Sequence, residues 1–156
     1  MDIKSAYNKV QKKYSLPSYE ELDHEFEFLY VNPIMELPPS LRFMRRRIND
    51  KIYVICNMIQ AIIQPNPSSF VNMQEASMFS KEDKEQLSEL LKECMQRERK
   101  SLLLDMDHDE KKDAEFIKES YTFWKKKKKE IVAFTQKLEE SWTKEETKGK
   151  NKHYFG

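Results

Sequence analysis

Residues 40–63, SLRFMRRRINDKIYVICNMIQAII, place a hydrophobic residue every three or four positions. The repeating residues are Leu41, Met44, Ile48, Ile52, Ile55, Ile59 and Ile62. At this spacing they share one stripe of an α-helix, and a continuous apolar stripe faces a hydrophobic core. Ser40 is a suitable N-cap for this helix, and Pro65 ends the pattern. The stretch therefore predicts a central core helix about 36 Å long.

The distribution of glycine favours an all-α fold for the rest of the chain. The two glycines among the 156 residues are Gly149 and Gly156. Hairpin turns, phosphate-binding loops and nucleophile elbows need residues with positive φ, which glycine adopts at the least cost. Because the first 148 residues contain no glycine, we expect helices and no enzyme built on such turns.

Other amphipathic segments flank the central helix. Two short helices are predicted before it, over residues 3–14 and 18–29. Residues 64–79 are predicted to be a loop packed against the bundle, and Ser80 caps the helix that follows. The apolar stripe of that helix comprises Leu87, Leu90, Leu91, Cys94, Met95, Leu102 and Leu103. With a long C-terminal helix, these segments predict a bundle of about five helices.

The C-terminal helix, predicted over residues 110–148, is about 58 Å long and exceeds the central helix. Its apolar stripe is interrupted by the five lysines of residues 125–129, which together cover every face of a helix. We therefore expect residues 131–148 to leave the bundle as a projecting arm. The predicted partner-binding residues are the apolar residues of this arm and two aromatic residues near the end of the chain: Ile131, Phe134, Leu138, Trp142, Tyr154 and Phe155.

The predicted helices form a single domain over residues 1–148, and residues 149–156 are predicted to be a disordered basic tail. The N-terminus does not resemble a signal peptide, and the longest apolar stretch, residues 52–63, is too short to span a bilayer. Cys56 and Cys94 fall on apolar stripes, where free cysteine behaves as a small buried hydrophobic residue. We expect a soluble cytoplasmic protein with no membrane partner.

Positive charge is concentrated in two places although the whole chain is nearly neutral. The 28 basic and 27 acidic residues give a net charge of +1, which offers no general attraction for nucleic acid. The two basic clusters are Arg42, Arg45, Arg46 and Arg47, and Lys125, Lys126, Lys127, Lys128 and Lys129. They form a candidate RNA or DNA surface. The alternative is that acids of residues 80–110 neutralise the arginines inside the bundle.

Two short motifs are candidate metal ligands. Glu21 and His24, and likewise Asp105 and His108, are three residues apart and so share a helix face. This spacing resembles the Glu-x-x-His pairs of di-iron carboxylate bundles. The alternative is that both histidines face solvent, and we predict no resident metal or cofactor.

Two further acidic patterns are less complete. Asp105, Asp107 and Asp109 have the first spacings of a calcium-binding loop, but the later positions of such a loop are missing. The pairs Glu82-x-x-Glu85 and Glu110-x-x-Asp113 resemble the acidic motifs of all-helical nucleoside-triphosphate pyrophosphatases. Acids in a first turn also complement the helix dipole, which is the structural alternative.

These observations order three functional hypotheses. The first is a non-enzymatic helical interaction or assembly module that binds another protein or a second copy of itself. The second is a nucleic-acid-binding protein that uses the arginine and lysine clusters. The third is a metal-dependent all-α hydrolase. No catalytic residues are predicted, since no strained nucleophile turn accompanies the three histidines.

Overall fold

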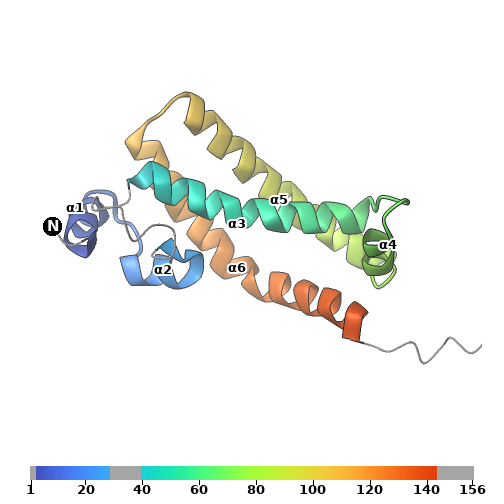
Figure 1. The fold of residues 1–156 in the computed structure, drawn as a ribbon. Coiled ribbons are helices and arrows are strands. Elements are labelled where there is room, and N and C mark those ends of the chain that lie inside the picture. The colour runs from blue at the N-terminus through green and yellow to red at the C-terminus, as the bar shows by residue number, and fades with distance from the viewer. Residues whose placement is uncertain (1–2, 29–39, 144–156) are drawn as a thin grey trace, which may run out of the picture.

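The computed structural model describes residues 3–28 and 40–143, and within these ranges it contains six α-helices and no strand (Figure 1). The helices are α1 (Ile3–Tyr14), α2 (Tyr19–Phe26), α3 (Leu41–Ile63), α4 (Phe70–Ala76), α5 (Lys81–Met106) and α6 (Glu110–Thr143). The predicted all-α fold is confirmed. The count is six rather than five because the predicted loop contains the short helix α4.

Helix α3 is the centre of the bundle. Every residue of its predicted stripe is buried, and it packs most extensively against α5 and α6. Helices α1 and α2 lie near the N-terminal end of α3, and α4 closes the opposite end (Figure 1). Within the described residues, no helix is both long enough and apolar enough to cross a membrane.

Side-chain caps define several helix ends in this glycine-poor chain. Ser18 with Glu21, and Ser80 with Asp83, form the capping boxes that the sequence predicts. Helix α2 ends earlier than predicted because Glu27 adopts a left-handed conformation with φ of 54°. Its N–H still donates to the Asp23 carbonyl at 2.8 Å, and the left-handed backbone at Glu27 turns the chain away and stops the helix after Phe26.

Helix α4 arises from a signal that the predicted loop assignment overlooked. Ser69 accepts a hydrogen bond from the N–H of Asn72 and so caps the helix in the usual manner. Ala76 and, just beyond it, Phe79 are buried, which ties the segment to the bundle as expected. Phe70, in contrast, lies on the outer face of α4.

The far half of α6 stays in the bundle, which corrects the prediction of a projecting arm for the residues described. Ile131, Phe134 and Leu138 are buried in the main hydrophobic core. The Phe134 ring packs against Phe79 with centroids 5.9 Å apart. Gln74 of α4 also donates to the Ser141 carbonyl at 3.2 Å. The loop and α4 therefore supply the surface that the sequence pattern did not reveal.

The lysine run does not detach the helix because its two inward-facing members reach acids on other helices. Lys127 pairs with Glu93 of α5 at 3.1 Å, and Lys128 pairs with Glu25 of α2 at 2.8 Å. Trp124, one turn before Lys128, and Ile131, about one turn after Lys127, are both buried. Long lysine stems can cover apolar surface while their ammonium groups reach charged partners.

Candidate functional site

The predicted partner-binding residues fall into three groups. Ile131, Phe134 and Leu138 are core residues, so they are not available to a partner in this fold. Trp142 remains on the surface with 48% of its area exposed. Tyr154 and Phe155 lie outside the described residues. Trp142 is therefore the residue around which a surface can be built.

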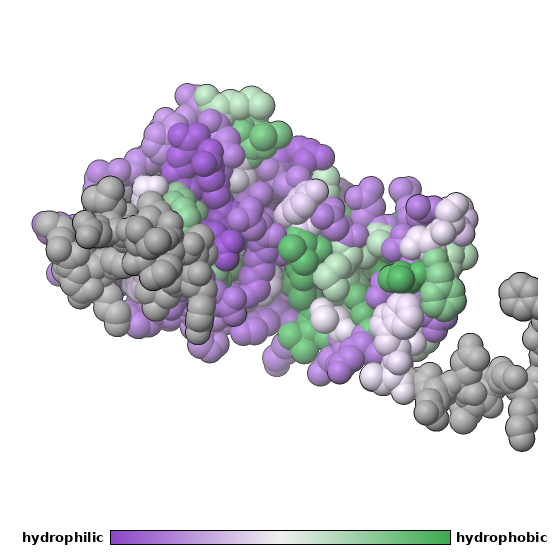
Figure 2. Space-filling model, in the orientation of Figure 1, coloured by the Kyte–Doolittle hydropathy of each residue, from purple (hydrophilic) through white to green (hydrophobic). Residues whose placement is uncertain are grey.

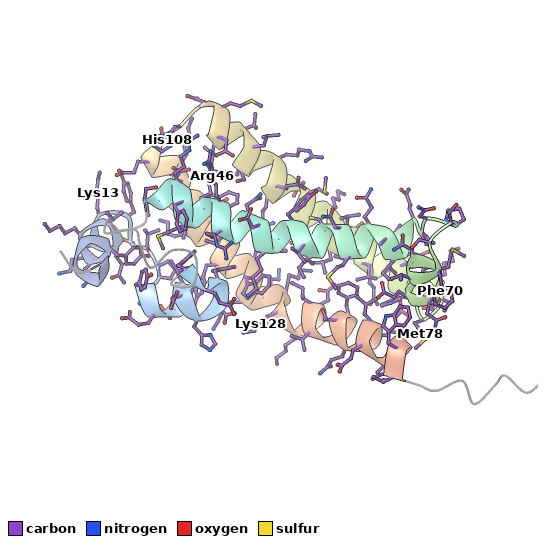
Figure 3. The ribbon with its side chains drawn as sticks, in the orientation of Figure 1. Lys13, Arg46, Phe70, Met78, His108 and Lys128 are labelled. Carbon is purple, nitrogen blue, oxygen red and sulfur yellow. The ribbon has the colours of Figure 1, made fainter. Side chains whose placement is uncertain are left out.

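Trp142 forms part of an exposed apolar cluster with α4. We call this cluster the aromatic end; it consists of Phe70, Val71, Met73 and Trp142. The Phe70 side chain is 75% exposed and contacts the Trp142 ring edge-on, with centroids 6.2 Å apart. Figure 3 places Phe70 at the tip of the molecule, next to the last turns of α6. Figure 2 shows apolar surface at this same end.

Helix α4 brings little charge to the aromatic end. The sequence of α4, FVNMQEA, contains one charged residue, Glu75. Its carboxylate accepts a hydrogen bond from the indole N–H of Trp142 at 2.9 Å, which fixes the orientation of the ring. The result is an oriented aromatic surface to which α4 contributes a single charged side chain.

One arginine of the cluster, Arg45, is neutralised inside the bundle, as the structural alternative expects. Arg45 is fully buried, and its Nε donates to the buried carboxylate of Asp113 at 2.6 Å. Its other nitrogens donate to Asp105 and to the Ser101 carbonyl, the latter at 2.8 Å. His108 Nδ1 lies 3.1 Å from the second oxygen of Asp113. Arg45 is thus a structural residue and not part of an exposed basic surface.

The neighbouring arginines also have acidic or carbonyl partners. Arg46 donates to Asp105 at 2.9 Å, Arg42 donates to the Asp105 carbonyl at 3.2 Å, and Arg47 lies 3.6 Å from Asp50. Burial raises the pKa of Asp105, but hydrogen bonds from Arg45 and Arg46 outweigh it and hold that pKa below its ordinary value. The ionised carboxylate offsets the positive charge at the N-terminus of α3.

The lysines divide between partly buried, ion-paired positions and exposed ones. Lys127 and Lys128 form the ion pairs described above, and Lys125 lies over the Tyr121 ring at 5.8 Å. Lys125, Lys126 and Lys129 are exposed. The predicted nucleic-acid surface of arginines and lysines is therefore not a single exposed face, because its central member, Arg45, is in the core.

Glu25 is a buried acid that forms an ion pair with Lys128 of the lysine run. Lys128 donates to both of its carboxylate oxygens, and the indole N–H of Trp124 donates to one of them at 2.7 Å. Burial raises the pKa of Glu25, but these hydrogen bonds outweigh it and lower the pKa below 4.5. A carboxylate with a lowered pKa stabilises the fold above its unfolded pKa and loses that contribution as the pH falls through its folded pKa.

Replacing Glu25 with glutamine should therefore cost about 1–3 kcal/mol near pH 7 and much less near pH 3. The free energy of unfolding of both proteins can be measured by urea denaturation, followed by circular dichroism, at several pH values in this range. Glu139→Gln, on an exposed position of α6, is the matched control and should change little. If the free energies of unfolding of the wild type and Glu25→Gln differ by the same amount at every pH, the assigned ion pair is contradicted.

The predicted metal residues do not converge. Glu21 is used in the capping box of α2, and the exposed His24 lies 3.5 Å from Glu25. Asp105 binds arginines, and His108 faces Asp113. Throughout the described ranges no three His, Cys, Asp or Glu residues form a group able to hold a metal ion.

The acidic pair Glu110 and Asp113 and the two cysteines also have structural positions. Glu110 accepts hydrogen bonds from Lys13 and Tyr14, and Asp113 is bound to Arg45. Cys56 and Cys94 are free and buried, as predicted. A hydrogen bond with Cys56, together with burial, raises the pKa of the Cys94 thiol. Asp113 and the cysteines are thus buried structural groups, and Glu110 is a surface partner of α1.

A second exposed apolar surface lies on α5. The sequence pattern places Leu102 and Leu103 on the core stripe, but the structure exposes 48% of Leu102 and 65% of Leu103. The run Leu102, Leu103 and Leu104 could have revealed this, because residues 100° apart cannot all face one core. Here Leu104 is the buried member.

Comparisons with known proteins add no function. No protein-family model matches the chain, and no curated protein or solved structure matches it.

Proposed function

We propose that this protein is a non-enzymatic helical assembly module that associates with a second copy of itself through the aromatic end. The observation that carries this proposal is the exposed Phe70 and Trp142 pair, oriented by Glu75 at one tip of the bundle. Exposed aromatic and methionine side chains are enriched at the centres of protein interfaces. Removing the four apolar side chains of the aromatic end from water would favour association.

The low charge of the aromatic end favours a second copy as the occupant. In a two-fold symmetric interface each patch meets its own copy, so any unpaired charge near the axis faces a like charge. The charged residue of α4, Glu75, already accepts a hydrogen bond from Trp142. Because Glu75 is the one charged residue that α4 contributes, the aromatic end brings few like charges together when it meets its own copy.

Solution mass measured by light scattering over a range of concentrations tests this proposal. The wild-type protein should form a dimer, and the double variant Phe70→Ser/Met73→Ser should be a monomer. The variant truncates two interface side chains on each copy, so a symmetric dimer loses four. At about 1 kcal/mol of binding free energy for each side chain, the loss is about 4 kcal/mol, which raises the dissociation constant roughly a thousandfold. Because both side chains are exposed, the melting temperature of the monomer should change little.

Val54→Ser is the matched control, since Val54 of α3 is also an exposed apolar residue. This variant should dimerise as the wild type does. A wild-type protein that stays monomeric at the highest concentration, or a double variant that still dimerises, would overturn the proposed use of the aromatic end.

A further inference from the structure

The outer face of α5 carries apolar residues, of which Met95 is partly buried against the core and Leu102, Leu103 and Met106 are exposed. The buried residues of α5 are Leu87, Leu90, Cys94, Ser101 and Leu104. At 100° per residue, Met95, Leu102 and Met106 lie away from that buried stripe and are aligned with one another, with Leu103 beside them. Leu103 is 65% exposed and Met106 is 76% exposed. Exposed apolar side chains that lie side by side on a helix are typical of a surface that another molecule covers on binding.

This outer face contains two adjoining shallow grooves. One, of about 490 Å³, is lined by Lys92, Met95, Gln96, Arg99, Lys100 and Leu103. The other, of about 400 Å³, shares Lys100 and Leu103 with it and continues to Met106 and Lys112. The distance along the helix from Lys92 to Met106 is about 21 Å, which matches four turns of a docked helix. Figure 2 shows apolar residues over the C-terminal end of α5, surrounded by hydrophilic ones.

The rim of these grooves is positively charged. Lys92, Arg99, Lys100 and Lys112 line them together with one acid, Asp107. The ion pairs that involve this rim are Arg99 with Glu98 at 2.9 Å, Lys100 with Glu119 at 2.7 Å and Lys112 with Asp107 at 3.9 Å. The cation of each pair is solvent-exposed, and exposed ion pairs contribute little to stability. These cations can therefore leave their present acids and pair with acids of a partner.

We infer that the outer face of α5 binds an acidic amphipathic helix of a partner protein. The apolar face of such a helix would cover Met95, Leu103 and Met106, and its acids would meet the basic rim. This inference rests on the proposed role as an interaction module, but it uses a surface distinct from the aromatic end. In Figure 3 the aromatic end, marked by Phe70, and His108, just beyond the end of α5, lie at opposite ends of the bundle.

The charge of this face separates its partner from that of the aromatic end. Two copies of the α5 face would bring like charges together, so this face does not suit self-association. The apolar floor distinguishes it from a surface that binds the phosphates of nucleic acid, where polar and charged contacts dominate. A dimer built at the aromatic end would present two copies of this docking face.

Fluorescence anisotropy with a synthetic acidic peptide tests the inference. The labelled probe is a peptide of about 16 residues with leucine at helical spacing i, i+3, i+4 and i+7 and glutamate at most other positions. It should bind saturably, with one peptide per protomer. Leu103→Glu should weaken binding at least tenfold, and Lys92→Glu should weaken it severalfold. Val54→Glu places the same new charge on α3 and should leave binding unchanged.

Three further measurements complete the test. A peptide with lysine in place of glutamate should not bind, which excludes nonspecific adhesion of leucine. The Phe70→Ser/Met73→Ser variant should bind the acidic peptide as the wild type does, so failure of the dimer proposal is distinguishable from failure of this one. Phosphatidylserine vesicles and a single-stranded RNA probe should bind less well than the peptide. Absence of peptide binding, equal binding by Leu103→Glu, or preference for vesicles or RNA would overturn the inference.

Discussion

Replacing Arg45 with alanine is expected to lower the free energy of unfolding by about 3–5 kcal/mol. The guanidinium is fully buried and serves Asp113, Asp105 and the Ser101 carbonyl at once. Its removal leaves the buried Asp113 carboxylate without its main partner. An uncompensated buried charge costs far more than an exposed ion pair contributes.

Urea denaturation followed by circular dichroism at neutral pH measures this effect. The matched control is Arg46→Ala, because Arg46 is the next residue in α3 and also binds Asp105. Its side chain is half-exposed, so its loss should cost no more than about 1 kcal/mol. Equal effects of the two substitutions would contradict the burial of Arg45.

A double substitution separates the cost of an unpaired charge from the value of the ion pair itself. Arg45→Met/Asp113→Leu removes both charges and fills most of the space with apolar atoms. This variant should recover much of the stability lost in Arg45→Ala, because replacing a buried pair by packed hydrophobic groups is often close to neutral. If it is less stable than Arg45→Ala, the remaining partners Asp105 and Ser101 contribute more than Asp113 does.

Ending the chain after Glu130 is expected to abolish the cooperative fold. The deletion removes Ile131, Phe134 and Leu138 from the core and exposes Phe79, against which Phe134 packs. Burial of three such side chains contributes about 5–9 kcal/mol, comparable with the whole stability of a typical domain of about 5–15 kcal/mol. Thermal unfolding by circular dichroism should show a broad transition or none.

A chain ending after Thr143 is the matched control, since it keeps every helix that the structure describes. It should unfold cooperatively near the wild-type temperature. Phe134→Ala in the full chain should cost about 3–5 kcal/mol and shows the effect without a deletion. If the chain ending after Glu130 melts as the wild type does, residues 131–143 form the projecting arm that the sequence pattern predicted.

Local features of the fold could be predicted because they depend on residues close together in the chain. The stripe from Leu41 to Ile62 identifies α3, since all its members are set by helical spacing alone. The capping boxes at Ser18 and Ser80 depend on a residue three positions ahead. The all-α class follows from the same local signals and from the near absence of glycine.

The candidate surfaces were predicted less well because exposure depends on distant segments. Trp142 was assigned as an interaction residue and is on the surface, but Ile131 and Phe134 in the same helix are covered by the segment around Phe79. Leu103 has the hydrophobicity of a core residue, yet it is exposed because Ser101 and Leu104 take the buried positions nearby. Periodicity identifies an apolar face without stating what lies against it.

The sequence by itself determined that the chain is helical, where most helices begin and which stripe of α3 is buried. The tertiary structure alone decided that Arg45 meets Asp113, that Lys128 meets Glu25 and that α4 covers the end of α6. The physical reason is sequence separation. Helical hydrogen bonds and caps join residues a few positions apart, whereas ion pairs and core contacts between helices join segments that only the packed bundle brings together.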